Sequence, residues 1–149
     1  MAAIEFRETP FGSADYNRTL QLRHRILRAP LGLDLFAENL AAEKEHRHFS
    51  LWQDNNLLAC LVIVPLSEGK VKLRQMAVND QYQRRGFGQQ LVARVENQLA
   101  CEGVQQIELH ARVTALPFYQ RSGYQAVGEV FVEVSIPHQE MVKTLTGSL

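Results

Sequence analysis

Cysteine, charge imbalance and long apolar segments are all scarce in this sequence. The two cysteines, Cys60 and Cys101, are too few for a disulfide framework and lack the spacing of metal ligands. With 16 basic and 16 acidic side chains the formal net charge is zero, so no overall field draws the protein to nucleic acid or anionic lipid. The longest apolar stretch, Leu57 to Leu66, is about half the length that crosses a bilayer, and the N-terminus has no signal-peptide pattern. We therefore expect a cytoplasmic protein without a metal, membrane or nucleic-acid partner.

Internal repeats and linkers are absent as well. No segment rich in Pro, Gly and Ser divides the chain, and no repeat stands out. With 46% hydrophobic and 21% charged residues, the composition is that of an ordinary globular protein. A single domain over residues 1–149 is the expected organisation.

Hydrophobic periodicity and turn residues predict an α/β domain. The expected strands cover Ile4 to Arg7, Arg47 to Gln53, Leu57 to Val64, Lys70 to Val78, Gln106 to Ala111, Tyr124 to Glu133 and His138 to Leu145. The expected helices run from the N-cap Ser13 to Arg28, from Leu35 to Lys44, from Gly86 to Glu102, and from a cap at Thr114 to Gly123. This order mixes α and β elements around one sheet.

The strand that ends at Val78 changes phase within its length. Its apolar residues fall at Val71 and Leu73 and then at Met76 and Val78, so one extra residue must be absorbed between Leu73 and Met76. A β-bulge absorbs such a residue, leaves backbone groups unpaired, and often lies beside a functional site. The phase change is therefore the first indication of a site.

A turn with two glycines and two arginines, Gln83-Arg84-Arg85-Gly86-Phe87-Gly88-Gln89, separates this strand from the next helix. Free N–H groups and the helix dipole favour a phosphate at such a place, and glycine lets the backbone approach it. An ordinary loop could use glycine for its geometry and arginine for solubility, so both interpretations stay open on these residues alone. The Walker pattern and the third glycine of the Rossmann fingerprint are absent.

The turn resembles the Gln/Arg-x-x-Gly-x-Gly/Ala signature of the GNAT superfamily of N-acetyltransferases, here Gln83-x-x-Gly86-x-Gly88. The resemblance implies a mixed, mostly antiparallel sheet of about seven strands flanked by about four helices. It also implies that acetyl-coenzyme A is the cosubstrate. Strand amides of Met76, Ala77 and Val78 would pair with the pantetheine arm. The turn residues Gln83, Arg84, Arg85, Gly86, Phe87, Gly88 and Gln89 would hold the pyrophosphate.

A second match lies downstream. Ala115-x-x-Phe118-Tyr119-x-x-x-Gly123-Tyr124 is similar to the family's Asn-x-x-Ala-x-x-Phe-Tyr-x-x-x-Gly-Phe element, with Arg112 in the place of the asparagine. Taken alone, Phe118 and Tyr119 would be core aromatics. The resemblance implies that Phe118 contacts the coenzyme and that the Tyr119 hydroxyl assists the leaving thiolate. A phenol with a pKa of about 10 donates a proton uphill to a thiol with a pKa of about 8.5, so we expect chiefly a hydrogen bond.

The C-terminal segments Gly128-Glu129-x-Phe131 and Ile136-Pro137-His138-x-x-Met141 resemble those of small bacterial GNAT members near the ElaA-like branch. The implied function is acetyl transfer from acetyl-CoA to a primary amine by direct attack, without a covalent enzyme intermediate. A CoA-binding module without turnover and an acyltransferase with a longer acyl donor remain alternatives. The sequence does not decide between a small-molecule and a peptide amine, or between a monomer and a homodimer.

The acceptor amine must lose a proton before it attacks, and several side chains could take it. The candidates are Glu43, His46, His48, Glu108, His110 and His138, and the sequence selects none of them. An N–H of the bulged strand near Met76 to Val78 would stabilise the oxyanion. Metal catalysis is not expected, because Glu45-His46-Arg47-His48 is not an H-E-x-x-H motif, and both cysteines are expected to be inert.

Overall fold

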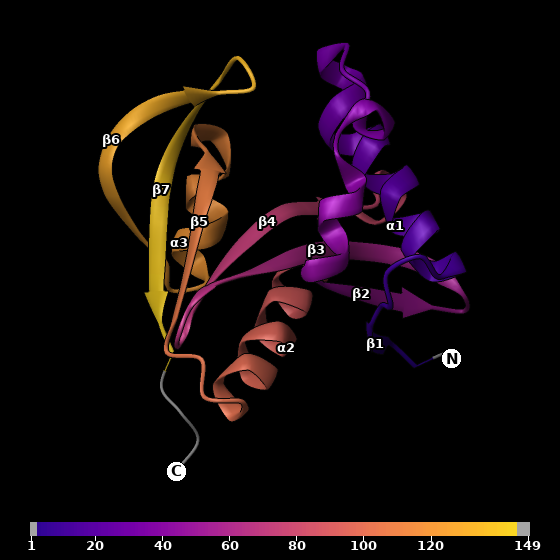
Figure 1. Ribbon diagram of the computed structural model, residues 1–149, viewed down its shortest axis with the longest axis horizontal. Helices are drawn as coiled ribbons and strands as arrows, with labels where there is room; N and C mark the ends of the chain where they lie inside the picture. The colour runs from indigo at the N-terminus through magenta and orange to yellow at the C-terminus, as the bar shows by residue number, and fades with distance from the viewer. Residues whose placement is uncertain (1–2, 146–149) are drawn as a thin grey trace.

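The computed structural model describes residues 3–145, which form a seven-stranded sheet in the order β1-β2-β3-β4-β5-β7-β6 (Figure 1). The strands are β1 (Glu5–Glu8), β2 (Arg47–Gln53), β3 (Asn56–Ser67), β4 (Lys70–Val78), β5 (Gln106–Arg112), β6 (Gln125–Glu133) and β7 (Ile136–Thr144). All neighbours are antiparallel except β4 and β5, which are parallel. The expected mixed, mostly antiparallel sheet is confirmed.

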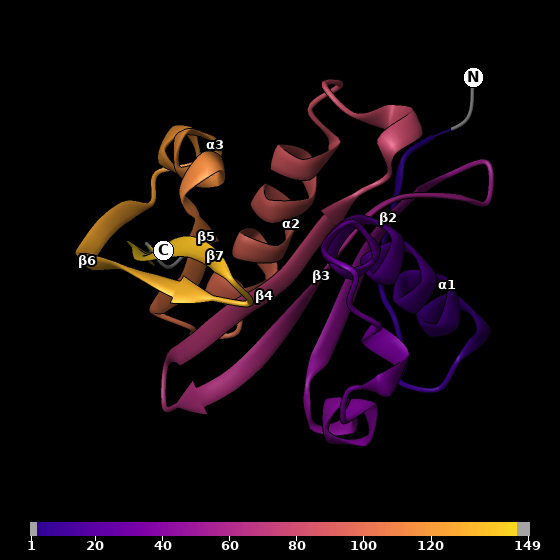
Figure 2. The same ribbon diagram turned by 90° about the horizontal axis from the view of Figure 1, so that it is seen from above.

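Helices cover both faces of the sheet. The α-helices are α1 (Ala14–Arg23), α2 (Phe87–Cys101) and α3 (Leu116–Arg121). In Figure 2, α1 lies on one side of β3 and β4, and α2 and α3 lie on the other. The apolar side of α2, including Leu91, Val95 and Leu99, packs with α3 and the sheet into the main core. A smaller cluster around Trp52 and Cys60 forms on the α1 side.

The predicted first helix continues past α1 without a break. Ser13 accepts a hydrogen bond from the Tyr16 N–H, so it is the N-cap as expected. A π-helical turn follows at His24–Arg28, and Ala29–Leu31 forms a short 3-10 turn. Such π turns often mark functional places in helices.

Two local predictions differ from the structure. The expected helix from Leu35 to Lys44 is two 3-10 segments, Leu35–Ala37 and Leu40–Glu45. Thr114 does not cap α3, because it lies inside the 3-10 turn Val113–Ala115 that runs directly into the helix. The N-cap residue is Ala115, and no side chain caps this helix.

The predicted bulge in β4 is confirmed. Cys60 of β3 pairs with Ala77 and Val62 pairs with Arg74, so β4 carries one residue more than β3 between these pairs. Gln75 is the residue at the bulge with a left-handed backbone, at φ 52°. That conformation is uncommon for a residue with a Cβ, so surrounding contacts must stabilise it.

Strands β4 and β5 part beyond the bulge. They pair only from Lys70↔Gln106 to Leu73↔Leu109, whereas β4 continues to Val78 and β5 to Arg112. Figures 1 and 2 show the two strands diverging from this short joint. Among the described residues, the edge of β4 from Arg74 to Val78 that faces β5 therefore has no strand partner.

Candidate active site

A cavity of about 460 Å³ lies where β4 and β5 part. The π-helical turn, both strands, the start of α3 and the β6–β7 hairpin contribute to its wall. Its lining residues are Ile26, Leu27, Arg28, Lys72, Leu73, Arg74, Gln75, Met76, Leu109, His110, Ala111, Arg112, Ala115, Tyr119, Glu133, Val134 and His138. This size is typical of a small-molecule site.

Tyr119 lies in the wall of this cavity, as a catalytic role requires. It is 7% exposed, and its ring packs edge-on against Phe118 at 4.9 Å and against Tyr124 at 5.7 Å. Burial raises the pKa of the Tyr119 phenol, so the hydroxyl keeps its proton at neutral pH. Within residues 3–145 no hydrogen bond engages this hydroxyl, which leaves it available to a ligand in the cavity.

The glycine turn brings α2 close to the end of β4. A Cβ on Gly88 would lie 3.0 Å from the side chains of Met76 and Val78 and 3.2 Å from the ring of Phe118, so only glycine allows this approach. Gly86 and Arg84 have left-handed backbones, with φ of 79° and 66°. Gly86 is the N-cap of α2, and no side chain of residues 3–145 caps the helix, so within this range its first N–H groups are free for an anion.

The expected coenzyme-binding residues fall into two groups in space. Met76, Val78, Phe118 and Gly88 meet at the start of α2, whereas the Ala77 side chain packs on the opposite face beside Cys60. The other turn residues, Gln83, Arg84, Arg85, Phe87 and Gln89, follow the end of β4 outside the cavity. The Arg85 guanidinium lies 5.7 Å over the Tyr82 ring. Of the expected coenzyme-binding residues, Met76 lines the cavity and also contacts the start of α2.

The structure separates the six candidate bases. Only His110 and His138 line the cavity; Glu108 and His46 do not. Glu43 is held by Arg23 and Tyr16, and His48 is buried with its Nε2 2.9 Å from the Glu43 carbonyl oxygen. Burial also lowers the pKa of His48, which keeps that imidazole neutral inside the protein.

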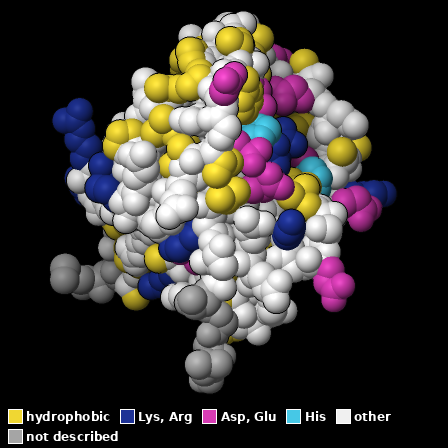
Figure 3. All heavy atoms as spheres, turned by 90° about the vertical axis from the view of Figure 1, so that its left-hand side faces the viewer, with side chains coloured by type: hydrophobic (Ala, Val, Ile, Leu, Met, Phe, Trp, Pro, Cys, Tyr) yellow, Lys and Arg dark blue, Asp and Glu magenta, His cyan; other side chains and the backbone are white. Residues whose placement is uncertain are grey.

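A histidine and carboxylate cluster lines the β6–β7 side of the cavity. His110 Nδ1 lies 3.1 Å from Glu133 Oε1 and 3.3 Å from Lys72 Nζ, and His138 Nε2 lies 3.9 Å from Glu133 Oε2. Burial raises the pKa of Glu133, but the hydrogen bond from His110 and the nearby charges of His110, His138 and Lys72 together lower it below its ordinary value, so the carboxyl stays ionised. Figure 3 shows histidine, acidic and basic side chains gathered on the face seen from this side. Sequence reasoning missed Glu133, since only the hairpin brings it to His110.

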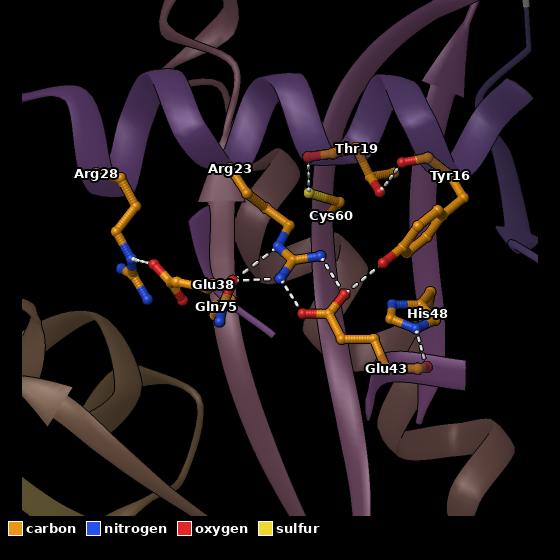
Figure 4. A network of polar contacts seen from close by, with 9 residues as sticks. All are labelled: Tyr16, Thr19, Arg23, Arg28, Glu38, Glu43, His48, Cys60 and Gln75. Atoms are coloured by element: carbon orange, nitrogen blue, oxygen red, sulfur yellow. Dashed lines mark hydrogen bonds and ion pairs between the residues drawn. The ribbon is translucent and has the colours of Figure 1, made fainter. Parts of the chain in front are cut away.

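A buried ion pair supports the bulge (Figure 4). Arg23 donates to both carboxylate oxygens of Glu43, at 2.9 and 2.5 Å, and Tyr16 donates to the same carboxylate at 2.6 Å. The Arg23 Nε also donates to Gln75 Oε1 at 2.8 Å. The network therefore fixes the side chain of the one bulge residue with a left-handed backbone. The burial of Arg23 could have been predicted from the sequence, because Arg23 shares a helix face with the buried Tyr16 and Leu20.

Two further arginines meet in the cavity wall. Arg28 Nη1 donates to the Leu27 carbonyl oxygen at 3.3 Å, and Arg112 Nη2 donates to the same oxygen at 3.2 Å. Arg28 also pairs with Glu38 at 2.6 Å. Arg112 occupies the position where the family pattern has asparagine. The contact between Arg112 and the Leu27 carbonyl oxygen therefore arises at a position where this sequence differs from that pattern.

Comparison with known proteins identifies the family. A model described as "Acetyltransferase (GNAT) domain" matches residues 29–145, and the chain therefore belongs to the GNAT acetyltransferase family. The chain is 24% identical over 146 residues to the uncharacterized protein YyaT of Bacillus subtilis, covering 91% of this chain and 93% of that protein.

Solved structures agree with this fold. Escherichia coli ElaA is 20% identical with a TM-score of 0.76, covering 96% of this chain and 99% of that chain. A Bacillus subtilis acetyltransferase solved in complex with CoA is 18% identical with a TM-score of 0.70, covering 98% and 100%. The predicted family and fold are confirmed, and membership supports an acyltransferase activity that uses coenzyme A.

Two observations bear on other classes of protein. No helix within residues 3–145 is long and apolar enough to cross a membrane. The same residues hold no group of three or more His, Cys, Asp or Glu side chains placed to bind a metal ion. Cys60 is buried, which raises the pKa of its thiol to about 12, and Cys101 is exposed.

Proposed function

We propose that this protein is a cytoplasmic N-acetyltransferase that transfers an acetyl group from acetyl-CoA to a primary amine by direct attack. The observation that carries the proposal is the opening between β4 and β5, with the buried Tyr119 hydroxyl in its wall and the uncapped start of α2 beyond it. A phenol with no partner in residues 3–145, beside an unpaired strand edge, fits a thioester donor better than a purely structural role.

The residues present fit acetyl-CoA along its length. The unpaired edge at Met76, Ala77 and Val78 offers backbone groups to the amides of a pantetheine arm. The N–H groups from Gly86 to Gln89, together with the exposed Arg84 and Arg85, suit a pyrophosphate. Gly88 keeps α2 close enough to β4 for both sets of groups to act on one molecule.

In the proposed reaction the amine nitrogen attacks the acetyl carbon, a C–N bond forms, and the C–S bond breaks. Tyr119 donates a hydrogen bond to the sulfur as negative charge develops there, coenzyme A leaves as the thiolate, and the thiolate takes up the proton that the attacking nitrogen releases as the amide forms. An N–H of the β4 edge stabilises the oxyanion. No enzyme nucleophile is required, and Cys60 lies in the separate cluster on the α1 side.

We propose that His110 accepts the proton that the amine loses before it attacks. When Nδ1 carries a proton and donates it to Glu133, Nε2 presents a lone pair and can accept the proton of the ammonium group. Glu133 then stabilises the imidazolium that forms.

The decisive experiment is a screen of amines with acetyl-CoA in which thiol release is measured with and without each amine. Amine-dependent release is the expected result. Binding of CoA in a calorimeter without turnover of any amine would instead favour a CoA-binding module, and faster release from propionyl-CoA or a longer thioester would favour another acyl donor. No binding of CoA at all would contradict the proposal.

A further inference from the structure

The wall of the cavity also carries two arginines that converge on one atom. Arg28 reaches the Leu27 carbonyl oxygen from the π-helical turn, and Arg112 reaches it from the end of β5. Since both guanidinium groups contact a single oxygen, at 3.3 and 3.2 Å, they must lie close to each other. Both residues line the cavity, so the pair faces the space in which an acceptor would bind.

This pair has more positive charge than its protein partners neutralise. Glu38 pairs with Arg28, but within residues 3–145 no carboxylate pairs with Arg112. Burial and the nearby Arg28 charge both lower the pKa of Arg112, which reflects the cost of holding the two cations together. Lys72 and Arg74 also line the cavity, whereas Glu133 is the one carboxylate among its lining residues.

We infer that the acceptor is an amine that also carries an oxyanion group, a carboxylate or a phosphate, and that Arg112 and Arg28 bind this group. The inference rests on the proposed function, because it places the amine at His110. Guanidinium groups present parallel N–H donors that match the oxygens of such anions, and a bound anion offsets the repulsion between the two arginines. The cavity thus offers two arginines for the anion and Glu133 for the ammonium group.

The position of Arg112 strengthens the argument. It lies at the end of β5, two residues beyond His110, so the anion site and the proton acceptor are on the same strand. Side chains two apart on a strand share one face, and both project away from the buried Leu109 and Ala111. One small molecule can therefore contact both residues within a cavity of about 460 Å³.

The test compares amines that differ only in the anion. Glycine, β-alanine and 4-aminobutanoate are assayed against methylamine, ethylamine and propylamine, with 2-aminoethyl phosphate as the phosphate arm. We expect kcat/KM for at least one anionic amine to exceed that of its matched alkylamine by about tenfold or more, as a charge-assisted pair of hydrogen bonds provides. The anion whose amine shows the larger gain in kcat/KM over its alkylamine, carboxylate or phosphate, is the one that the site prefers. Equal use of both sets of amines would overturn the inference.

Arg112→Gln then locates the effect. This variant should raise KM for the anionic amine about tenfold, leave KM for acetyl-CoA unchanged, and lose the preference over the alkylamine. Arg112→Lys, which keeps the charge without the paired donors, should recover part of it. Arg121→Gln on the exposed side of α3 is the control and should change nothing. A raised KM for acetyl-CoA in Arg112→Gln would place Arg112 in the donor site instead.

Failure of the proposed function gives a different result from failure of this inference. If no amine is acetylated, the proposed function fails, and the anion site is tested by calorimetric titration of the wild-type protein and Arg112→Gln with the same amino acids and 2-aminoethyl phosphate. Binding that the substitution abolishes supports the site, and absence of binding to the wild-type protein contradicts it. A melting temperature close to that of the wild type shows that Arg112→Gln is folded; if it is not, Arg28→Gln replaces it.

Discussion

At the scale of single residues, Tyr119 carries the most specific chemical prediction. Its hydroxyl is held in the cavity wall by ring contacts alone, and its pKa is raised by burial. Tyr119→Phe should therefore lower kcat by about 10- to 100-fold, the value of one hydrogen bond to a developing anion, while KM for acetyl-CoA changes less than about twofold. Steady-state kinetics on both substrates provides the measurement.

The neighbouring Tyr124 offers a matched control. Its hydroxyl is buried and has no hydrogen-bond partner among residues 3–145, and its ring lies 5.7 Å from that of Tyr119. Tyr124→Phe removes an equivalent oxygen atom and should leave kcat unchanged. Equal losses in both variants would mean that the effect arises from packing and not from the Tyr119 hydroxyl.

His110 carries the second prediction at this scale. His110→Gln removes the imidazole nitrogen that would accept the amine proton, so kcat should drop about 100-fold while KM for acetyl-CoA changes little. Glu133→Gln removes only the partner of Nδ1 and should reduce kcat less. Steady-state kinetics measures both effects, and an unchanged kcat in His110→Gln would assign the proton to water or to another group.

Much of the site was visible in short segments of sequence, and the rest was not. The bulge and the glycine turn could be predicted, because period and glycine placement act over a few residues, as Leu73 to Met76 shows. Glu133 and the arginine pair depend on segments far apart in the chain coming together. No local pattern encodes such contacts.

At the scale of elements, the packing of α2 on β4 depends on one missing side chain. Gly88→Ala would place a methyl group 3.0 Å from Met76 and Val78, which forces the start of α2 away from the end of β4. We expect KM for acetyl-CoA to rise about tenfold and the free energy of unfolding to fall by about 1 to 3 kcal/mol. Calorimetric titration with CoA and urea unfolding measure the two effects.

The other end of α2 supplies the control for this variant. Gly103 has a φ of 95° and no atom within 4 Å of its Cβ position, so Gly103→Ala introduces backbone strain without a clash. It should cost about 1 kcal/mol of stability and leave CoA binding intact. A Gly88→Ala variant with wild-type affinity for CoA would contradict the assigned role of the turn.

Element boundaries show the same division between local and distant causes. Ser13 was predicted as an N-cap and is one, because its hydroxyl acts three residues away. Thr114 was predicted as a cap and is not, since the preceding 3-10 turn continues into α3. The segment from Leu35 to Glu45 forms tight 3-10 turns, and within it Leu35 and Glu43 are buried against α1 and its network.

At the scale of the whole molecule, stability in acid should depend on Glu43. Burial alone would raise its pKa, but hydrogen bonds from Arg23 and Tyr16 lower it below the ordinary value. A carboxyl with a lowered pKa in the folded state contributes stability at neutral pH that is lost as the pH falls through that pKa. The wild-type protein should therefore lose stability steeply below about pH 4.

Glu43→Gln tests this expectation. Loss of the ion pair leaves Arg23 buried without compensation, which should cost about 3 kcal/mol at neutral pH, and the difference from wild type should shrink in acid. Urea unfolding between neutral and acidic pH measures both. Glu5→Gln at the exposed edge should cost less than about 0.5 kcal/mol, and an equal cost would contradict the argument.

The short joint between β4 and β5 has a consequence for how the molecule holds together. In the described sheet, four strand-paired positions of β4 and β5, from Lys70↔Gln106 to Leu73↔Leu109, join the half-sheet of β1 to β4 to the half-sheet of β5 to β7. A donor molecule bound along the open edge of β4 would contact both half-sheets and stabilise their arrangement while it is bound. Amide hydrogens on both sides of the joint, and not only those in contact with the donor, should then exchange more slowly when it is bound.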